Sequence, residues 1–390
     1  MATKGKEIAE RWKASTAAED EVTSDSAPTE SPATSPEDQA VNDVGGSKFS
    51  PKKEGEAQAQ SNFSTDSEEH KIYGQELGAI FKDNDVHPIF IFGSKGAGKT
   101  SILASLFKYA QTGQAQVSLS LRDDLFPSGN EFSRFHVKVV RDFYYKKIIA
   151  WIEGKAPVTT QEDVPFFIPV MLKLTTGEEV NFAFLEGKGE WYMPDHDAEI
   201  PFKPFQGFVR GVLEQYNNAA TAIFVAPYAT GSIQESSRSP DLRNSDLGLV
   251  GAIGEYLDYR AALLHRDKQL FLVSKWDVFC GGIAGDSFIN PQDEELVGVC
   301  EERFEFSWAR YQGMGGSARN QNKRFSAYSS GIIQDKEILR PAKEDMVYID
   351  QYARKMWNWL YQNHTGKSLY PDMDPKSENF LDRLLRIIRG

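Results

Sequence analysis

The stretch that decides the fold is Pro88-Ile-Phe-Ile-Phe92, followed at once by Gly93-Ser-Lys-Gly-Ala-Gly-Lys-Thr100. A short apolar run of this kind is typical of a strand that is buried on both faces of a parallel sheet. Residues 101–111 then carry apolar side chains at helical spacing, which predicts a helix. The sequence therefore predicts a strand, a glycine-rich loop and a helix in immediate succession.

The loop matches the pattern G-x-x-x-x-G-K-[ST], which is typical of a polyphosphate-binding loop. Its glycines can turn several backbone N–H groups toward one concavity, and the positive end of the following helix attracts an anion. Lys99 would neutralise the outer phosphates, and the Thr100 hydroxyl would coordinate Mg²⁺. The alternative, an ordinary glycine turn, does not explain the position between strand and helix. The residues predicted to bind phosphate are Gly93, Ser94, Lys95, Gly96, Ala97, Gly98, Lys99, Thr100 and Ser101.

Strands and helices alternate from about residue 71 onward. The predicted strands are 166–175 and 180–185, which form a hairpin, and then 220–226, 270–274 and 324–327. The predicted helices are 73–81, 132–152, 246–265, 291–312 and 343–363. This alternation predicts an α/β fold with a doubly wound, mostly parallel sheet that has one antiparallel hairpin and helices on both faces.

Charge and composition divide the chain into three parts. Residues 1–70 hold seven Lys and Arg against fifteen Asp and Glu, so we expect a disordered acidic tail rich in Ser, Thr and Pro. Residues 71–370 form the predicted domain, with insertions at 113–160 and 279–322. Residues 371–390 contain an amphipathic segment, which we expect to dock on the domain; contact with a partner or with an anionic membrane surface is the alternative.

Composition also disfavours several classes of protein. The chain has no apolar run long enough to span a membrane and no apolar signal sequence, so we expect a cytoplasmic protein. Cys280 and Cys300 are too few for a disulfide framework, and no Cys/His spacing predicts a metal site. The net charge of -12 disfavours a specific nucleic acid partner.

Three later segments place polar residues at the ends of predicted strands. They are Glu186-Gly-Lys-Gly189-Glu190, Ser274-Lys275-Trp276-Asp277 and Ser326-Ala327-Tyr328. Together with the glycine loop they follow the order GxxxxGK[ST], DxxG, [NT]KxD and SA[KL]. Over about residues 85–365 the chain therefore resembles the Ras-like (TRAFAC-type) P-loop GTPase superfamily. The segment 154–160 and the strand pair after it look most like the bacterial double-GTPase-like branch.

The resemblance implies a protein that binds GTP or GDP with Mg²⁺, hydrolyses GTP to GDP and phosphate, and acts as a molecular switch on a protein effector or regulator. It implies that Thr100 and Glu186 hold Mg²⁺ and that Lys99, Glu190 and Thr160 act in hydrolysis, with Thr159 as the alternative to Thr160. The further residues expected to contact the nucleotide are Gly189, Ser274, Lys275, Asp277, Ser326, Ala327 and Tyr328.

The chain departs from the family pattern at several positions. Glu186 replaces an Asp, which lengthens the arm that carries the carboxylate. Glu190 replaces a water-orienting Gln and brings negative charge toward the γ-phosphate. Lys95 occupies a position that is often small, where it could supply positive charge or obstruct an arginine finger. Ser274 replaces Asn or Thr, and Tyr328 replaces Lys or Leu.

Two other functions stay open on the sequence alone. The first is a nucleotide-dependent scaffold that scarcely hydrolyses GTP, which Glu190 favours. The second is an ATP-dependent P-loop enzyme, which would require that Ser274-Lys275-Trp276-Asp277 is only a polar turn after a buried strand.

Overall fold

The computed structural model describes residues 67–112, 115–129, 131–155, 164–192, 205–229, 239–281, 288, 291–314, 322–334, 337–339 and 346–370. The elements below all belong to the unit Thr65–Gly390. Of the expected disordered tail 1–70, residues 1–66 lie outside the described residues, as do the expected C-terminal amphipathic segment 371–390, Thr159 and Thr160. Residues 68–70 are not part of a disordered tail, because they form the first turn of the helix Glu68–Asp83, in which His70 is buried.

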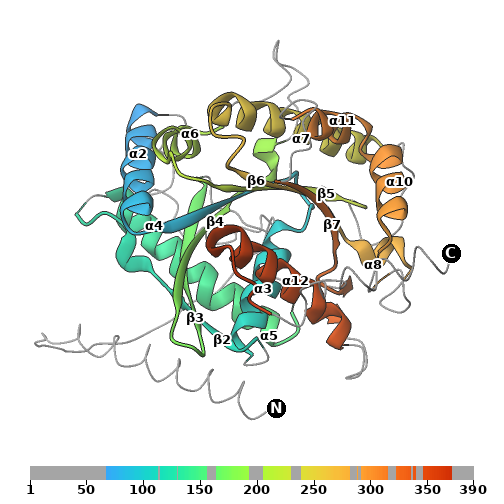
Figure 1. Cartoon of the computed structure of the whole chain (residues 1–390), viewed down its shortest axis with the longest axis horizontal. Coiled ribbons are helices and arrows are strands. Elements are labelled where there is room, and N and C mark those ends of the chain that lie inside the picture. The colour runs from blue at the N-terminus through green and yellow to red at the C-terminus, as the bar shows by residue number, and fades with distance from the viewer. Residues whose placement is uncertain are drawn as a thin grey trace, which may run out of the picture. The chain divides into compact units, whose positions relative to one another are not determined.

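The described part of the chain folds around a seven-stranded sheet with the strand order β2-β3-β4-β1-β5-β6-β7 (Figure 1). In that order the strands are β2 (Val117–Leu121), β3 (Phe166–Leu174), β4 (Glu179–Glu186), β1 (Val86–Phe92), β5 (Thr221–Pro227), β6 (Lys268–Ser274) and β7 (Lys323–Tyr328). Strand β3 runs antiparallel to both β2 and β4, and all other neighbours are parallel. The predicted α/β fold with a mostly parallel sheet is therefore confirmed.

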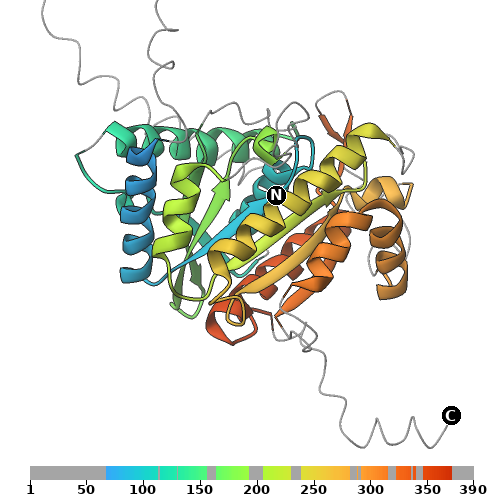
Figure 2. The same ribbon diagram turned by 90° about the horizontal axis from the view of Figure 1, so that it is seen from above.

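Helices cover both faces of this sheet (Figures 1 and 2). One face carries α2 (Glu68–Asp83), α6 (Gly207–Gln215), α7 (Pro240–Arg260), α10 (Asp293–Arg303) and α11 (Glu305–Gly313). The other face carries α3 (Lys99–Gln111), α5 (Ile148–Ile152) and α12 (Met346–Thr365). A continuous helical stretch, α4 (Glu131–Asp142), the π-helical turn η2 (Phe143–Lys147) and α5, corresponds to the helix predicted at 132–152.

The shorter elements are the 3₁₀ turns η1 (Asp123–Leu125) and η3 (Gly189–Tyr192), the short helix α8 (Trp276–Phe279), and a hairpin of β8 (Ile332–Gln334) and β9 (Glu337–Leu339). None of the helices in the described ranges combines the length and the apolarity needed to cross a membrane.

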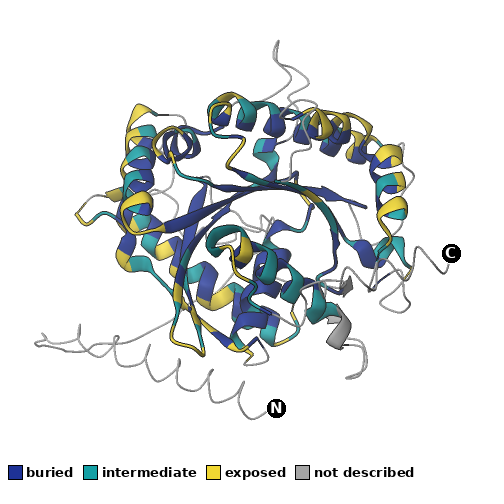
Figure 3. Ribbon diagram, in the orientation of Figure 1, coloured by how far each residue is buried: buried dark blue, intermediate teal, exposed yellow. Residues whose placement is uncertain are grey.

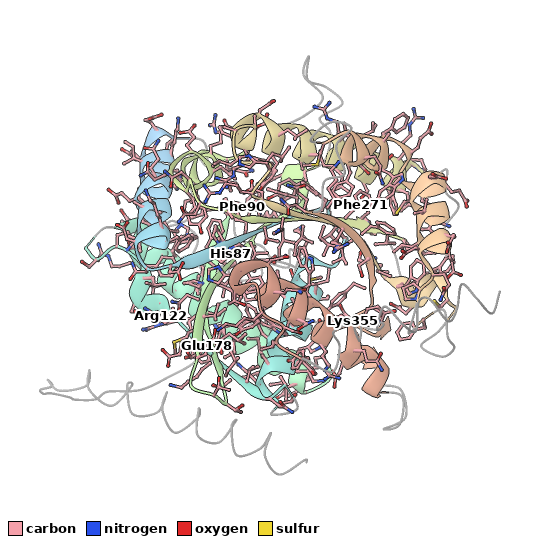
Figure 4. The ribbon with its side chains drawn as sticks, viewed as in Figure 1. His87, Phe90, Arg122, Glu178, Phe271 and Lys355 are labelled. Carbon is pink, nitrogen blue, oxygen red and sulfur yellow. The ribbon has the colours of Figure 1, made fainter. Side chains whose placement is uncertain are left out.

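Burial explains why the sequence forms these strands. Every residue of β1 and of β5 is buried, which is what a strand covered on both faces requires (Figure 3). Phe90 of β1 and Phe271 of β6 lie in this central part of the sheet (Figure 4). The core is strongly aromatic, since Phe90 and Phe92 both contact the ring of Tyr256 from α7.

Of the described elements that were not predicted from the sequence, strand β2 and helix α6 are the longest. Strand β2 lies within the stretch expected to be an insertion, and it extends the sheet by pairing with β3. Its residues Val117, Leu119 and Leu121 alternate with two exposed serines, the pattern of a half-buried strand. Helix α6 is the other; its nine residues lie between the η3 turn and β5 and pack along α2.

The helix predicted at 291–312 is broken at Phe304 into α10 and α11. The cause is a carboxylate on another helix. Asp246 of α7 accepts hydrogen bonds from the backbone N–H groups of Phe306 and Ser307, and from the Ser307 hydroxyl. A side chain that satisfies these first N–H groups starts a new helix at that point.

Helices α2 and α6 approach each other closely because glycines line their contact. A Cβ atom at Gly74 would overlap the carbonyl of Phe208, and one at Gly211 would overlap the carbonyl of Lys71. Helix α2 is fixed at its start by Ser67, whose hydroxyl accepts a hydrogen bond of 3.3 Å from the His70 N–H. This helix pair forms one side of the layer that covers β1.

Candidate functional site

The carboxyl ends of β1, β4, β5, β6 and β7 meet at one edge of the sheet, because these strands are parallel. The helix after β1 is α3, and the helix after the neighbouring β5 is α7; the two lie on opposite faces (Figure 1). A crevice between two such strands is where open α/β sheets bind ligands. The predicted glycine loop leaves β1 at this point.

The loop from Gly93 to Gly98 joins β1 directly to α3. Gly96 (φ 76°) and Gly98 (φ 85°) adopt left-handed backbone conformations that disfavour residues with a side chain. The residue at the N-cap of α3 is Gly98, which has no side chain to accept the first N–H groups of the helix. The N–H groups at the start of a helix of this length form a site for an anion when no side chain accepts them.

Lys99, the first residue of α3, is buried. Its ammonium donates a hydrogen bond of 2.7 Å to the Gly93 carbonyl, and it lies 5.6 Å from the centre of the Tyr192 ring. Burial lowers the pKa of Lys99, while the negative charges of Glu186 and Glu190 act in the opposite direction. The ammonium thus lies under the loop, with two carboxylates near it.

Thr100 and Glu186 form the second contact at this edge. The Thr100 hydroxyl donates a hydrogen bond of 2.9 Å to Oε1 of Glu186, which is only 1% exposed at the end of β4. A hydroxyl and a carboxylate are oxygen ligands of the kind that Mg²⁺ takes, alongside phosphate oxygens and water. The described residues contain no cluster of three or more His, Cys, Asp or Glu that could hold a metal. The pair would supply two of the oxygen ligands of an Mg²⁺ ion, and a phosphate and water would have to supply the others.

The turn η3 packs directly on the glycine loop. A Cβ at Gly189 would overlap the backbone of Ser94 and Lys95, so only glycine allows this approach. The next residue, Glu190, forms an ion pair of 2.9 Å with Lys95 through Oε1. Partial burial raises the pKa of Glu190, but the hydrogen bond from Lys95 and the charges of Lys95 and Lys99 outweigh it and lower the pKa.

The segment Ser274-Lys275-Trp276-Asp277 is tied to the same loop. The Ser274 hydroxyl donates a hydrogen bond of 2.8 Å to the Ala97 carbonyl. Lys275 has a left-handed backbone (φ 57°), and Asp277 lies in the first turn of α8. Burial raises the pKa of the Asp277 carboxyl, and a hydrogen bond of 2.6 Å from the Ser329 hydroxyl opposes that rise. The carboxylate is therefore buried and is held in place by Ser329.

The third predicted segment forms the last three residues of β7. Ser326 and Ala327 lie within β7 and not after its end, and the Ser326 hydroxyl donates to the Ala327 carbonyl. The buried hydroxyl of Tyr328 lies 2.7 Å from the Ser105 hydroxyl on α3. It is Ser329, the first residue after the strand, that contacts Asp277. Sequence reasoning missed Ser329, although the Ser329-Ser330-Gly331 turn after a strand was a readable signal.

Of the remaining predicted residues, Ser94 and Ser101 are described by the structure, and Thr160 is not. Ser94 is buried in the loop, and its hydroxyl lies 2.5 Å from that of Ser245 on α7, another contact that sequence reasoning missed. Ser101 lies in the first turn of α3. Thr160 lies outside the described residues, so its predicted role in hydrolysis stays a prediction.

No protein-family model matches this chain, and no curated protein matches it in a sequence search.

Taken together, the carboxyl ends of the parallel strands bring together Lys95, Lys99, Glu186, Glu190, the start of α3 and the buried Asp277. Lys95 and Lys99 can bind phosphate oxygens, as can the N–H groups of α3. Asp277 offers carboxylate oxygens to donors at the other end of the site. Such an arrangement can bind a ligand with a polyphosphate at one end and hydrogen-bond donors at the other.

Proposed function

We propose that this protein is a Ras-like P-loop protein that binds GTP and GDP with Mg²⁺ and hydrolyses GTP. The observation that carries the proposal is the hydrogen bond from Ser274 to Ala97. It joins the glycine loop, where a polyphosphate would bind, to the segment that carries Asp277. The proposed phosphate site and the proposed nucleobase site are then held at a fixed distance from each other at the carboxyl ends of the strands.

The charges of the site suit the reaction. Lys99 and the first N–H groups of α3 would bind the phosphates and stabilise the charge that develops when water attacks the γ-phosphate. Mg²⁺, held through Thr100 and Glu186, would neutralise part of the same charge. Glu190, which pairs with Lys95 of the loop, is the residue that we propose orients the water.

A second candidate is a nucleotide-dependent scaffold with little hydrolysis. The observation that favours it is the ion pair between Glu190 and Lys95. Against the effect of partial burial, pairing with Lys95 lowers the pKa of Glu190, which makes its carboxylate a weaker base toward water. Measured turnover of bound GTP separates the two candidates. In either case the nucleotide would control contact with a protein effector or regulator.

The preference for guanine tests the proposal directly. Asp277 would accept hydrogen bonds from the N1–H and the exocyclic amine of guanine, and adenine offers neither donor. An unpaired buried carboxylate costs roughly 1–3 kcal/mol or more, so GTP should bind about ten- to a hundredfold more tightly than ATP.

The matched variant is Asp277→Asn. It replaces an acceptor oxygen by an amide donor, which opposes the guanine amine but matches the carbonyl that xanthine carries there. The variant should lose GTP affinity and gain XTP affinity. Competition binding with GTP, ATP and XTP on both proteins measures this. Stronger binding of ATP by the wild type, or unchanged GTP affinity of the variant, would contradict the proposal.

A further inference from the structure

Lys95 and Glu190 form an ion pair beside the glycine loop, and unlike Lys99 and Glu186 they are partly exposed to solvent. Lys95 and Glu190 pair at 2.9 Å with side chains that are 64% and 44% exposed. The backbone contact of Gly189 with Ser94 and Lys95 fixes Glu190 next to the loop. One oxygen of Glu190, Oε2, is buried and accepts no hydrogen bond from any of the described residues.

The order of the strands decides which part of a nucleotide would face this pair. Asp277 follows β6, and the loop follows β1. Glu186 is the last residue of β4, and η3 follows it; β4 lies on the other side of β1 from β6. A nucleotide whose base lies at Asp277 runs toward β4 as its phosphates succeed one another. Its terminal phosphate would therefore lie nearest to Glu190.

We propose that Lys95 and Glu190 form a specificity-determining pair that makes the site discriminate against the terminal phosphate of a nucleoside triphosphate. This inference rests on the nucleotide-binding function proposed above. The ion pair with Glu190 makes the Lys95 ammonium unavailable to a phosphate. The Glu190 carboxylate also places negative charge where a γ-phosphate would have to lie, and that phosphate is itself close to doubly charged at pH 7. A diphosphate lacks that group, so it binds without displacing the carboxylate.

The charges around Lys99 support the same conclusion. The carboxylates of Glu186 and Glu190 both act on the Lys99 ammonium. Glu186 is buried and accepts a hydrogen bond from Thr100, whereas the side chain of Glu190 is 44% exposed and pairs with Lys95, for which a phosphate would compete. Of these two carboxylates, Glu190 is thus the one that a terminal phosphate can replace.

The experiment compares GDP with a non-hydrolysable GTP analogue on the full chain by calorimetry in excess Mg²⁺. Glu190→Gln removes the negative charge and frees Lys95. It should tighten binding of the triphosphate analogue about three- to tenfold and leave GDP affinity unchanged. Lys95→Met should weaken binding of the analogue by a similar factor, because Glu190 then faces the phosphate without its counter-charge.

Glu178→Gln is the matched control. Glu178 pairs with Lys367 at 3.1 Å with comparable exposure, but it lies at the opposite end of β4, beside the β3–β4 turn (Figure 4). This variant should change neither affinity. Because the Lys95–Glu190 pair is exposed, its effect should also shrink as salt is raised.

The outcomes separate the two proposals. Binding of both nucleotides with a GDP-to-analogue ratio that Glu190→Gln leaves unchanged would overturn the specificity pair alone. An equal shift of that ratio in Glu178→Gln would also overturn it, since the effect would then follow from net charge. Failure of the wild type to bind either nucleotide would overturn both the specificity pair and the proposed function.

Discussion

Ser329 is the residue that the tertiary structure adds to the candidate site. Its hydroxyl donates to Oδ1 of Asp277, and it also accepts a hydrogen bond from the Gly331 N–H. This fixes the carboxylate that we propose recognises guanine, in the way that a neighbouring group orients a ligand-binding side chain.

We therefore predict that Ser329→Ala weakens GTP binding by about fivefold, because a hydrogen bond to a charged group contributes on the order of 1 kcal/mol or more. The loss should be smaller for ATP, whose base does not use Asp277. Ser330→Ala is the control, since its side chain is at the next position on the same turn. Equal losses in both variants, measured by nucleotide titration, would show that the turn as a whole matters and not the contact with Asp277.

At the scale of elements, the crossing of α2 and α6 depends on glycine. Gly211→Ala would place a methyl group on the Lys71 carbonyl and force the two helices apart. We expect the free energy of unfolding to fall by about 1–3 kcal/mol, since overpacking a close contact costs more than the helix propensity of Ala returns.

Gly298→Ala should instead raise the free energy of unfolding, because this glycine lies on an open helix surface. A Cβ at Gly298 of α10 would meet no atom within 4 Å. This variant should gain up to about 1 kcal/mol from helix propensity alone. Urea unfolding of both variants measures the two signs; a stabilised Gly211→Ala would mean that α2 and α6 are not held this closely in solution.

At the scale of the whole molecule, two buried histidines make the fold sensitive to acid. Burial, together with nearby positive charge, lowers the pKa of His87 and of His136 from 6.5 to about 3. For His136 the charge is that of His70, and for His87 it comes from His364, Arg260 and Lys268. The folded state keeps both rings neutral, whereas the unfolded chain protonates them near pH 6.5.

Their contribution is therefore complete above about pH 6.5 and is lost as the pH falls from there toward 3, by about 1.4 kcal/mol per pH unit for each ring. His136→Phe replaces one of these two rings with a ring that does not titrate, so the variant should not lose that part of its stability at low pH. Neither ring nitrogen of His136 has a hydrogen-bond partner among the described residues, and its neighbours Tyr73 and Phe208 are aromatic. The variant should be more stable than the wild type at pH 5, by a margin that shrinks toward pH 7.

The control is His265→Gln, which removes an imidazole from an exposed position. Urea unfolding at pH 5, 6 and 7 provides the measurement. Parallel pH profiles for His136→Phe and the wild type would show that His136 is protonated in the folded state as readily as in the unfolded chain.

A buried ion pair lies at the amino ends of the central strands, opposite the candidate site. Arg260 at the end of α7 pairs with Asp267 at 2.7 Å, and both side chains are fully buried. Arg260 also donates to the carbonyls of Tyr216 and Asn218, and Asp267 accepts from the Tyr256 hydroxyl and the Ala220 N–H. The cluster fixes the amino ends of β5 and β6, so that their carboxyl ends meet at the candidate site.

The sequence by itself determined those features whose causes lie within a few residues of each other. The apolar run of β1, the left-handed glycines at 96 and 98, and the turn at Gly177 between β3 and β4 are local, because burial pattern and backbone freedom are properties of the segment itself. The mostly parallel sheet followed from the alternation of such segments. These features place the glycine loop and Glu186 at one edge without any knowledge of distant contacts.

Only the tertiary structure decided the features whose causes lie far apart in the chain. Asp246 breaks the helix at Phe304 from about sixty residues away, Lys95 meets Glu190 across the loop, and Ser329 meets Asp277. Helix α6 was missed because its glycine-rich sequence has low helix propensity, and packing against α2 offsets that cost. A hydrogen bond or an ion pair needs its partner within a few ångströms, and for these residues only the folded chain provides that partner.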